Sequence, residues 1–125
     1  MEHKKTVKTF RDLIAWQKAM ALAREVYRAT AQMPDSEKFG LTTQMRRAAV
    51  SIPSNIAEGC GKDSDAELKR YFLISMGSAS ELEYLLILAH DLGYLTENAF
   101  QSMTNDLVEI RKMLNAFIQK LKASR

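Results

Sequence analysis

The residues of this sequence that could carry chemistry are its lysines and arginines, which occur in short clusters. Such clusters can neutralise the phosphates of a nucleic acid without any base-reading motif. The candidate nucleic-acid-binding set is Arg46, Arg47, Lys69, Arg70, Arg111, Lys112, Lys120, Lys122 and Arg125. Neighbouring residues on a helix point about 100° apart, so these side chains cannot all share one surface. A scatter of solubilising charges is the alternative interpretation.

Catalytic and metal-binding patterns are missing from the sequence. It has no phosphate-binding glycine loop, and its two histidines, His3 and His90, stand far apart. Glu81 and Glu83 precede no histidine at the offset used by di-iron bundles. We therefore expect a non-enzymatic protein with no catalytic residue, no metal and no cofactor. A metal-dependent nuclease or hydrolase that uses Glu58, Glu81 and Glu83 ranks last among the hypotheses.

Length and composition predict one soluble domain in the cytoplasm. A chain of 125 residues, 46% of them hydrophobic, can bury a sizeable core without disulfides or a metal. Its single cysteine, Cys60, can form no intramolecular disulfide, which favours a reducing compartment. The N-terminal residues lead into no apolar segment, so we expect no signal peptide and no membrane association. The predicted domain is residues 1–125, with a flexible basic leader over residues 1–9.

Periodicity and punctuation divide the chain into four long helices and no strands. The first helix is predicted from Asp12 to Gln32. Its apolar face contains Leu13, Trp16, Met20, Ala23 and Tyr27, with Ala19, Leu22 and Val26 beside them. The second helix is predicted from an N-cap at Thr42 to Gly59-Cys60-Gly61, where glycine could supply the positive φ of a C-terminal cap.

The two later helices have clearer boundaries. The third begins at Ser64-Asp65-Ala66-Glu67, a capping box, and ends at Gly93. Thr96 can cap the fourth, whose apolar residues alternate steps of three and four: Phe100, Met103, Leu107, Ile110, Leu114, Phe117 and Leu121. Short connections make sequential helices antiparallel neighbours. The predicted fold class is therefore all-α, an up-down-up-down antiparallel four-helix bundle.

The second helix contains an unusual polar segment, Ser51–Gly59, with a proline at position 53. One stripe of this helix is apolar and is assigned to the core: Met45, Ala49, Ile52 and Ile56. Another stripe is polar: Gln44, Arg47, Ser51, Asn55 and Glu58. The polar row is either a solvated or internally satisfied face, or a binding surface. Small residues over 77–81 of the third helix are expected to pack against the second, with Glu81 near Arg46 or Arg47.

The net charge of +3 hides a strong segregation along the chain. Residues 1–62 carry +5, residues 63–109 carry −7, and residues 110–125 carry +5. The basic ends of one copy could meet the acidic middle of another copy or of a partner protein. This pattern supports a rival hypothesis, a protein–protein interaction scaffold without nucleic-acid binding.

Four motifs, in order and at matching spacing from about residue 9 to 121, resemble a known bacterial family. They are residues 10–20 (FRDLIAWQKAM), 39–49 (FGLTTQMRRAA), 51–59 (SIPSNIAEG) and 77–83 (GSASELE). Together they resemble the four-helix-bundle proteins encoded in intervening sequences of 23S rRNA genes. That family is related to the accessory variability protein of diversity-generating retroelements.

The resemblance implies a ring-like homo-oligomer, a pentamer, with a basic surface. In the retroelement relatives that surface binds nucleic acid and a reverse transcriptase. We accordingly predict a non-enzymatic, homo-oligomeric bundle that binds RNA or DNA weakly through the candidate set. Its expected partners are further copies of itself, RNA or DNA, and a reverse transcriptase or another protein.

Overall fold

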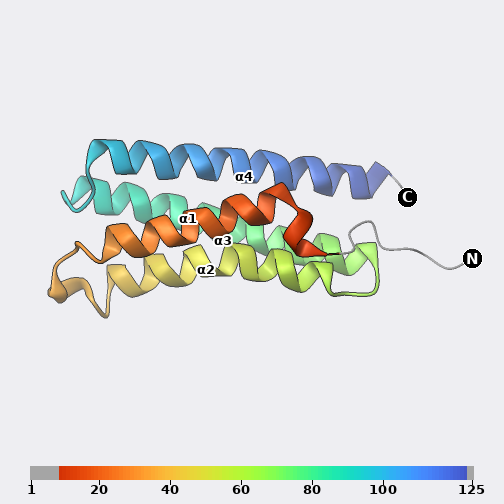
Figure 1. The fold of residues 1–125 in the computed structure, drawn as a ribbon, viewed down its shortest axis with the longest axis horizontal. Helices are drawn as coiled ribbons and strands as arrows, with labels where there is room; N and C mark the ends of the chain where they lie inside the picture. Colours follow the sequence, from red (N-terminus) through yellow and green to blue (C-terminus); the bar gives the residue numbers. More distant parts are fainter. Residues whose placement is uncertain (1–8, 124–125) are drawn as a thin grey trace, which may run out of the picture.

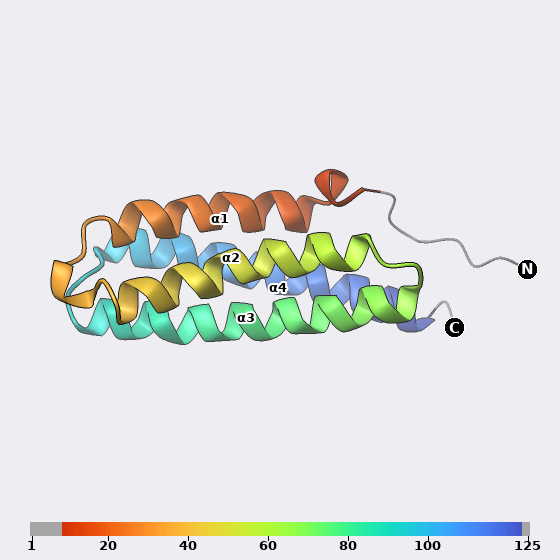
Figure 2. The ribbon, with the colours of Figure 1, turned by 90° about the horizontal axis from the view of Figure 1, so that it is seen from below.

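The computed structural model describes residues 9–123, and the side chains up to Leu121, as four long helices joined by short loops. They are α1 (Ile14–Thr30), α2 (Leu41–Cys60), α3 (Asp65–Asp91) and α4 (Glu97–Ala123). Two 3₁₀ turns, η1 (Phe10–Asp12) and η2 (Asp35–Glu37), precede α1 and α2. Sequential helices run antiparallel side by side (Figures 1 and 2), which confirms the predicted all-α bundle. All of the predicted flexible leader except Thr9 lies outside the described residues.

The predicted core stripes of α2 and α4 are confirmed. The apolar row of α2 is fully buried: Met45, Ala49, Ile52 and Ile56. Along α4 the buried residues are Met103, Leu107, Ile110, Leu114, Ile118 and Leu121. Phe100 and Phe117 are half-buried against this core, and the Phe117 ring meets that of Phe72 from α3 edge-on at 5.3 Å. The apolar residues of these helices form narrow faces, so the spacing of those residues along the chain is enough to identify the buried side.

The prediction for α1 was right in part: the wide apolar face is present, but its buried centre lies on the smaller residues, and the helix is about two residues shorter at each end. The buried residues of α1 are Ala15, Ala19, Leu22, Ala23, Val26 and Thr30. Trp16 and Met20 are half-buried, and Tyr27 is exposed. The apolar residues of α1 cover most of its circumference. Small alanines can therefore lie at the centre of the contact with the other helices, while the larger side chains lie at the edge of that contact. Asp12 lies in η1, and the helix ends at Thr30, before Gln32.

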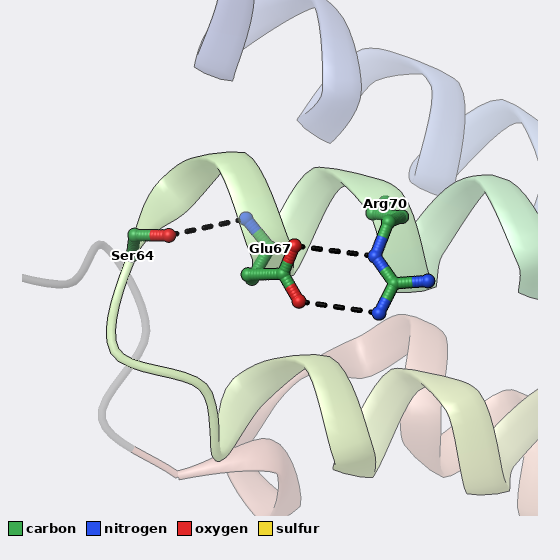
Figure 3. Close-up of polar contacts among 3 residues, drawn as sticks. All are labelled: Ser64, Glu67 and Arg70. Atoms are coloured by element: carbon green, nitrogen blue, oxygen red, sulfur yellow. Dashed lines mark hydrogen bonds and ion pairs between the residues drawn. The ribbon is translucent and has the colours of Figure 1, made fainter.

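The predicted N-terminal caps of α3 and α4 are present. Ser64 Oγ accepts a hydrogen bond from the Glu67 amide at 3.2 Å, and Thr96 Oγ1 accepts one from the Ala99 amide at 3.1 Å. Only half of the capping box forms, because the Glu67 carboxylate pairs with Arg70 (Figure 3). The third helix ends as predicted, before a glycine at position 93 with φ of 82°.

Both ends of α2 differ from the prediction. Thr42 is not the N-cap, because the helix already starts at Leu41. The Leu41 amide donates instead to Glu37 Oε1 at 3.2 Å, and Tyr94 donates to Glu37 Oε2 at 3.2 Å. At the other end Gly61 has φ of −85°, and the only positive-φ glycine among the described residues is at position 93. The glycines of this segment therefore supply no left-handed cap.

The prediction that the small residues over 77–81 pack against α2 holds only in part. The Ser78 hydroxyl lies 2.7 Å from that of Ser51 in α2, and Ala79 is fully buried, whereas Gly77 and Ser80 are exposed. Ser75, outside the predicted range, is fully buried and donates to the Ile52 carbonyl at 2.9 Å. An added Cβ at Gly77 would meet nothing within 4 Å. Gly77 therefore faces away from the bundle.

The third helix is more apolar than the sequence analysis allowed. By length and composition alone α3 is a candidate membrane span, although 44% of the apolar window is buried inside the bundle. The core helix of a soluble protein passes the same test, so this is weak evidence for a membrane segment. The sequence analysis overlooked this run because its apolar residues are interrupted by serines and by two glutamates.

Candidate nucleic-acid interface

Part of the predicted basic set comes together at the end of the bundle where the described chain begins and ends. Lys69 and Arg70 lie in the first turns of α3, and Lys120 lies in the last turn of α4. The start of α3 and the end of α4 lie at the same end of the bundle as the end of α2 (Figures 1 and 2). Lys62, in the loop after α2, adds a cation that the sequence analysis did not select. We call Lys62, Lys69, Arg70 and Lys120 the basic end.

An aromatic ring lies against two cations of the basic end. Lys62 Nζ is 5.1 Å, and Arg70 Cζ 4.6 Å, from the centroid of the Tyr71 ring. Arg70 also donates two hydrogen bonds of 3.2 Å to the Glu67 carboxylate (Figure 3). The hydrogen bond with Glu67 raises the pKa of Arg70, and the same bond lowers the pKa of Glu67. Arg70 is therefore oriented and partly neutralised by its own helix.

Two lysines of the basic end remain available for phosphate. Lys120 is exposed and Lys69 is half-buried, and neither makes an ion pair or hydrogen bond within the described part of the chain. An ammonium group attracts phosphate as a point charge and needs no base contact. Lys122 lies in the last turn of α4, and Arg125 lies outside the described residues.

Arg46 lies at the opposite end of the bundle and has a structural role. Its Nε donates to Thr30 Oγ1 at 2.8 Å, one terminal nitrogen reaches the Tyr27 carbonyl at 3.4 Å, and the guanidinium lies 4.5 Å from the centroid of the Tyr27 ring. The C-terminal carbonyls of a helix lack partners within it, so Arg46 caps α1. The adjacent Arg47 is exposed and makes no ion pair among the described residues.

The third predicted pair, Arg111 and Lys112, lies midway along α4, and its two side chains have different surroundings. Arg111 donates to Glu83 Oε1 of α3 at 2.9 Å. This hydrogen bond lowers the pKa of Glu83. Lys112 is exposed on a different side of the helix. The structure thus splits the predicted set into the basic end, two structural arginines, and the separate Arg47 and Lys112.

The polar row of α2 is partly structural. The Asn55 amide donates to the Ser51 carbonyl at 2.8 Å and to its hydroxyl at 3.0 Å, and that hydroxyl meets Ser78 of α3. These two residues are therefore satisfied within the bundle. The row continues into a polar groove of about 710 Å³ between α2 and α3, lined in part by Arg47 and Glu81. Glu81, Arg46 and Arg47 all line this groove, but no hydrogen bond or ion pair joins Glu81 to either arginine among the described residues.

An apolar groove between α1 and α2 was not predicted. Its volume is about 700 Å³, and its walls include Trp16, Met20 and Tyr27 from α1 and Val50 and Pro53 from α2. The signal in the sequence was the wide apolar face of α1, which exceeds what one helix can bury. The groove offers large apolar surfaces and few polar atoms, so it suits a protein surface better than a phosphate backbone.

The acidic residues and His90 are spread over the part of the chain that the structure describes. In that range no three His, Cys, Asp or Glu side chains gather closely enough to hold a metal ion. Glu83 is engaged by Arg111. His90 Nε2 lies 2.9 Å from Glu97 Oε1, and its ring stacks on Phe100 at 4.1 Å. His90 therefore ties the end of α3 to the start of α4.

Comparison with known proteins identifies the family of the chain and finds solved structures similar to it. The family model for the 23S rRNA-intervening sequence protein matches residues 11–116. A crystal structure of a protein of unknown function from the S23 ribosomal protein family of Bacteroides thetaiotaomicron superposes with a TM-score of 0.79. It is 28% identical, and the match covers 85% of this chain and 96% of that one. No curated protein matches the chain.

Proposed function

Since this chain belongs to the family of 23S rRNA-intervening sequence proteins, we propose that it is a non-enzymatic, homo-oligomeric bundle that binds RNA or DNA through its basic end. The observation that carries the proposal is the position of four cations at three helix ends on one end of the bundle: Lys62, Lys69, Arg70 and Lys120. The family is that of a small helical protein and not a known enzyme class. The ring expected from the resemblance, a pentamer, belongs to the same proposal.

The basic end is suited to weak, sequence-independent binding. Lys69 and Lys120 have no ion-pair partner within the described residues, whereas Arg70 and Lys62 flank the Tyr71 ring. Phosphate neutralisation supplies affinity that falls with salt and carries no sequence information. One copy offers only a few contacts, so assembly strengthens binding by linking several weak sites.

The test is binding of a labelled RNA hairpin and a DNA duplex across a salt series that begins at low ionic strength. We expect the double variant Lys69→Glu/Lys120→Glu to weaken binding. Each lost phosphate contact should also reduce the log–log salt slope by about 0.9 on duplex DNA. The matched control, Lys38→Glu/Lys112→Glu, makes the same change in net charge away from the basic end. Absence of binding at low salt, or equal loss in both double variants, overturns the proposal.

The rival function, a protein-interaction scaffold without nucleic-acid binding, is supported by the apolar groove between α1 and α2. The same salt series decides between them. A scaffold predicts no binding of either nucleic acid at any salt concentration, together with an assembly that forms in their absence.

A further inference from the structure

The outward face of α3 carries an apolar stripe with no partner among the described residues. Its large side chains, all 40% exposed or more, are Leu73, Ile74, Tyr84, Ile87 and Leu88. At about 100° per residue they fall on one side of the helix. The inner face of α3 is also apolar, since it buries Leu68, Phe72, Leu82, Leu85 and Leu86. Large apolar side chains on both the inner and the outer face of a helix are typical of a helix that is covered on both faces.

Gly77 lies in the middle of this stripe and opens a shallow notch. A Cβ at Gly77 would have nothing within 4 Å, so the packing of the bundle does not require a glycine there. Glycine in a helix interior is less favourable than alanine. A surface that approaches α3 closely from outside would give that glycine a function, because the absent side chain leaves space between Ile74 and Tyr84.

The apolar groove between α1 and α2 matches the α3 stripe in chemistry and in length. Its floor and walls are apolar and include Trp16, Met20, Val50 and Pro53. The α3 stripe from Leu73 to Leu88 is about 22 Å long, and the α1 wall from Trp16 to Tyr27 is about 17 Å long, at 1.5 Å per residue. A ridge and a groove of comparable length therefore stand on the same molecule.

We propose that the α3 stripe of one copy docks into the α1–α2 groove of a second copy, in a head-to-tail interface. This inference rests on the homo-oligomer of the proposed function and names the surfaces that form it. A head-to-tail chain leaves a free ridge on one terminal copy and a free groove on the other, so it continues until a ring closes. A symmetric α3–α3 dimer would leave the groove open, whereas the ring covers both surfaces on every copy.

The charges beside the two surfaces favour a side-by-side alignment. Alternate helices of the bundle run in the same direction, so α1 and α3 are parallel (Figure 1). In copies aligned side by side, Glu81 and Asp91 from the C-terminal half of α3 approach Arg24 from the C-terminal half of α1. At the other end Arg70 approaches Asp12. Antiparallel copies would instead bring Arg70 toward Arg24.

The first experiment measures the mass of the nucleic-acid-free full chain by size-exclusion chromatography with light scattering. Tyr84→Lys changes the ridge, where Tyr84 is 54% exposed, and Val50→Lys changes the groove, where Val50 is 41% exposed. Each should reduce the assembly to a monomer, because docking would bury an unpaired ammonium group. The control, Val108→Lys, alters a residue of α4 that is 36% exposed and outside both surfaces, and should keep the wild-type mass.

The decisive experiment mixes the two variants. The Tyr84→Lys copy keeps an intact groove and the Val50→Lys copy keeps an intact ridge, so a 1:1 mixture should form heterodimers. Growth stops there, because the remaining ridge and groove each carry a lysine. Circular dichroism checks the fold, and Ser54→Arg at the groove rim replaces Val50→Lys if that variant unfolds. Persistent assembly of either single variant, or a mixture that stays monomeric, overturns the inference.

These outcomes are distinct from a failure of the proposed function. A wild-type chain that is monomeric overturns the interface and the oligomer together, while nucleic-acid binding is measured separately on the same sample. A wild-type oligomer that survives both substitutions overturns the interface alone.

Discussion

Gly59 and Gly77 are both helical glycines, yet alanine should have opposite effects at the two positions. A Cβ at Gly59 would lie 2.9 Å from Tyr71 Cβ and 3.2 Å from the Leu68 carbonyl oxygen of α3. Neither atom is the tip of a flexible side chain, so α2 and α3 must shift apart. A Cβ at Gly77 meets nothing within 4 Å. The two positions therefore separate the cost of packing from the gain in helix propensity.

The magnitude follows from the difference between the two variants. Replacing a helical glycine with alanine stabilises a helix by about 1 kcal/mol, somewhat less near its end. Overpacking a close contact costs about 1–3 kcal/mol. Gly77→Ala gains helix propensity and makes no new close contact. Gly59→Ala gains the same helix propensity but is also destabilised by overpacking. We expect the free energy of unfolding of Gly59→Ala to be about 1–3 kcal/mol below that of Gly77→Ala.

Urea denaturation followed by circular dichroism measures this difference, with equal m-values as the check for comparable unfolding. Both substitutions are made in the Tyr84→Lys background, so that assembly does not contribute to the measured stability. Equal stability of the two variants, or a more stable Gly59→Ala, would refute the packing argument. Gly61→Ala should be within about 0.5 kcal/mol of the parent, because Gly61 has an ordinary negative φ.

Three further substitutions test individual contacts by denaturation. Arg46→Ala should destabilise the fold by about 1.5–3 kcal/mol, because charge-assisted hydrogen bonds at the end of α1 are lost, and Arg46→Lys should not restore them. Ser64→Ala should cost about 1 kcal/mol through loss of the α3 cap. The hydrogen bond with Arg111 lowers the pKa of Glu83, so the pair stabilises the fold at a pH above the ordinary carboxyl pKa. This stabilisation is lost as the pH falls through the lowered pKa of Glu83. Glu83→Gln should therefore flatten the pH dependence of stability below about pH 4.5; an unchanged acid profile would contradict this role.

The parts of the fold that were predictable are those fixed within one helix. The apolar steps of α4 and the Met45-to-Ile56 row of α2 have narrow faces, so their period alone fixes the buried side. Ser64 and Thr96 cap their helices through bonds to amides three residues away. Each of these features depends on spacing along the chain and on no distant partner.

The parts that were not predictable depend on residues far apart in the sequence. The phase of α1 depends on which of its apolar residues meets α2 and α4. The glycine at position 59 is explained only by Tyr71 and Leu68 on the next helix. Arg46 and Arg111 looked like binding residues, because their partners, Thr30 and Glu83, are sixteen and twenty-eight residues away. A cluster of like charges along the chain does not show which of its members are already paired.

Assembly and nucleic-acid binding should respond differently to salt, because different forces carry them. The proposed interface is mainly apolar, and its charges set orientation, so the oligomer should persist at about 1 M salt, where the Debye length is roughly 3 Å. Binding through the basic end should be lost well below that concentration. Parallel alignment of the copies also places every basic end on the same side of the ring. Nucleic-acid binding should therefore depend on assembly. Tyr84→Lys should therefore weaken RNA binding without touching a phosphate contact, whereas Lys69→Glu/Lys120→Glu should weaken it and leave the oligomer mass unchanged. An oligomer that dissociates over the same salt range as the RNA would show that charge pairing, and not the apolar ridge, holds the copies together.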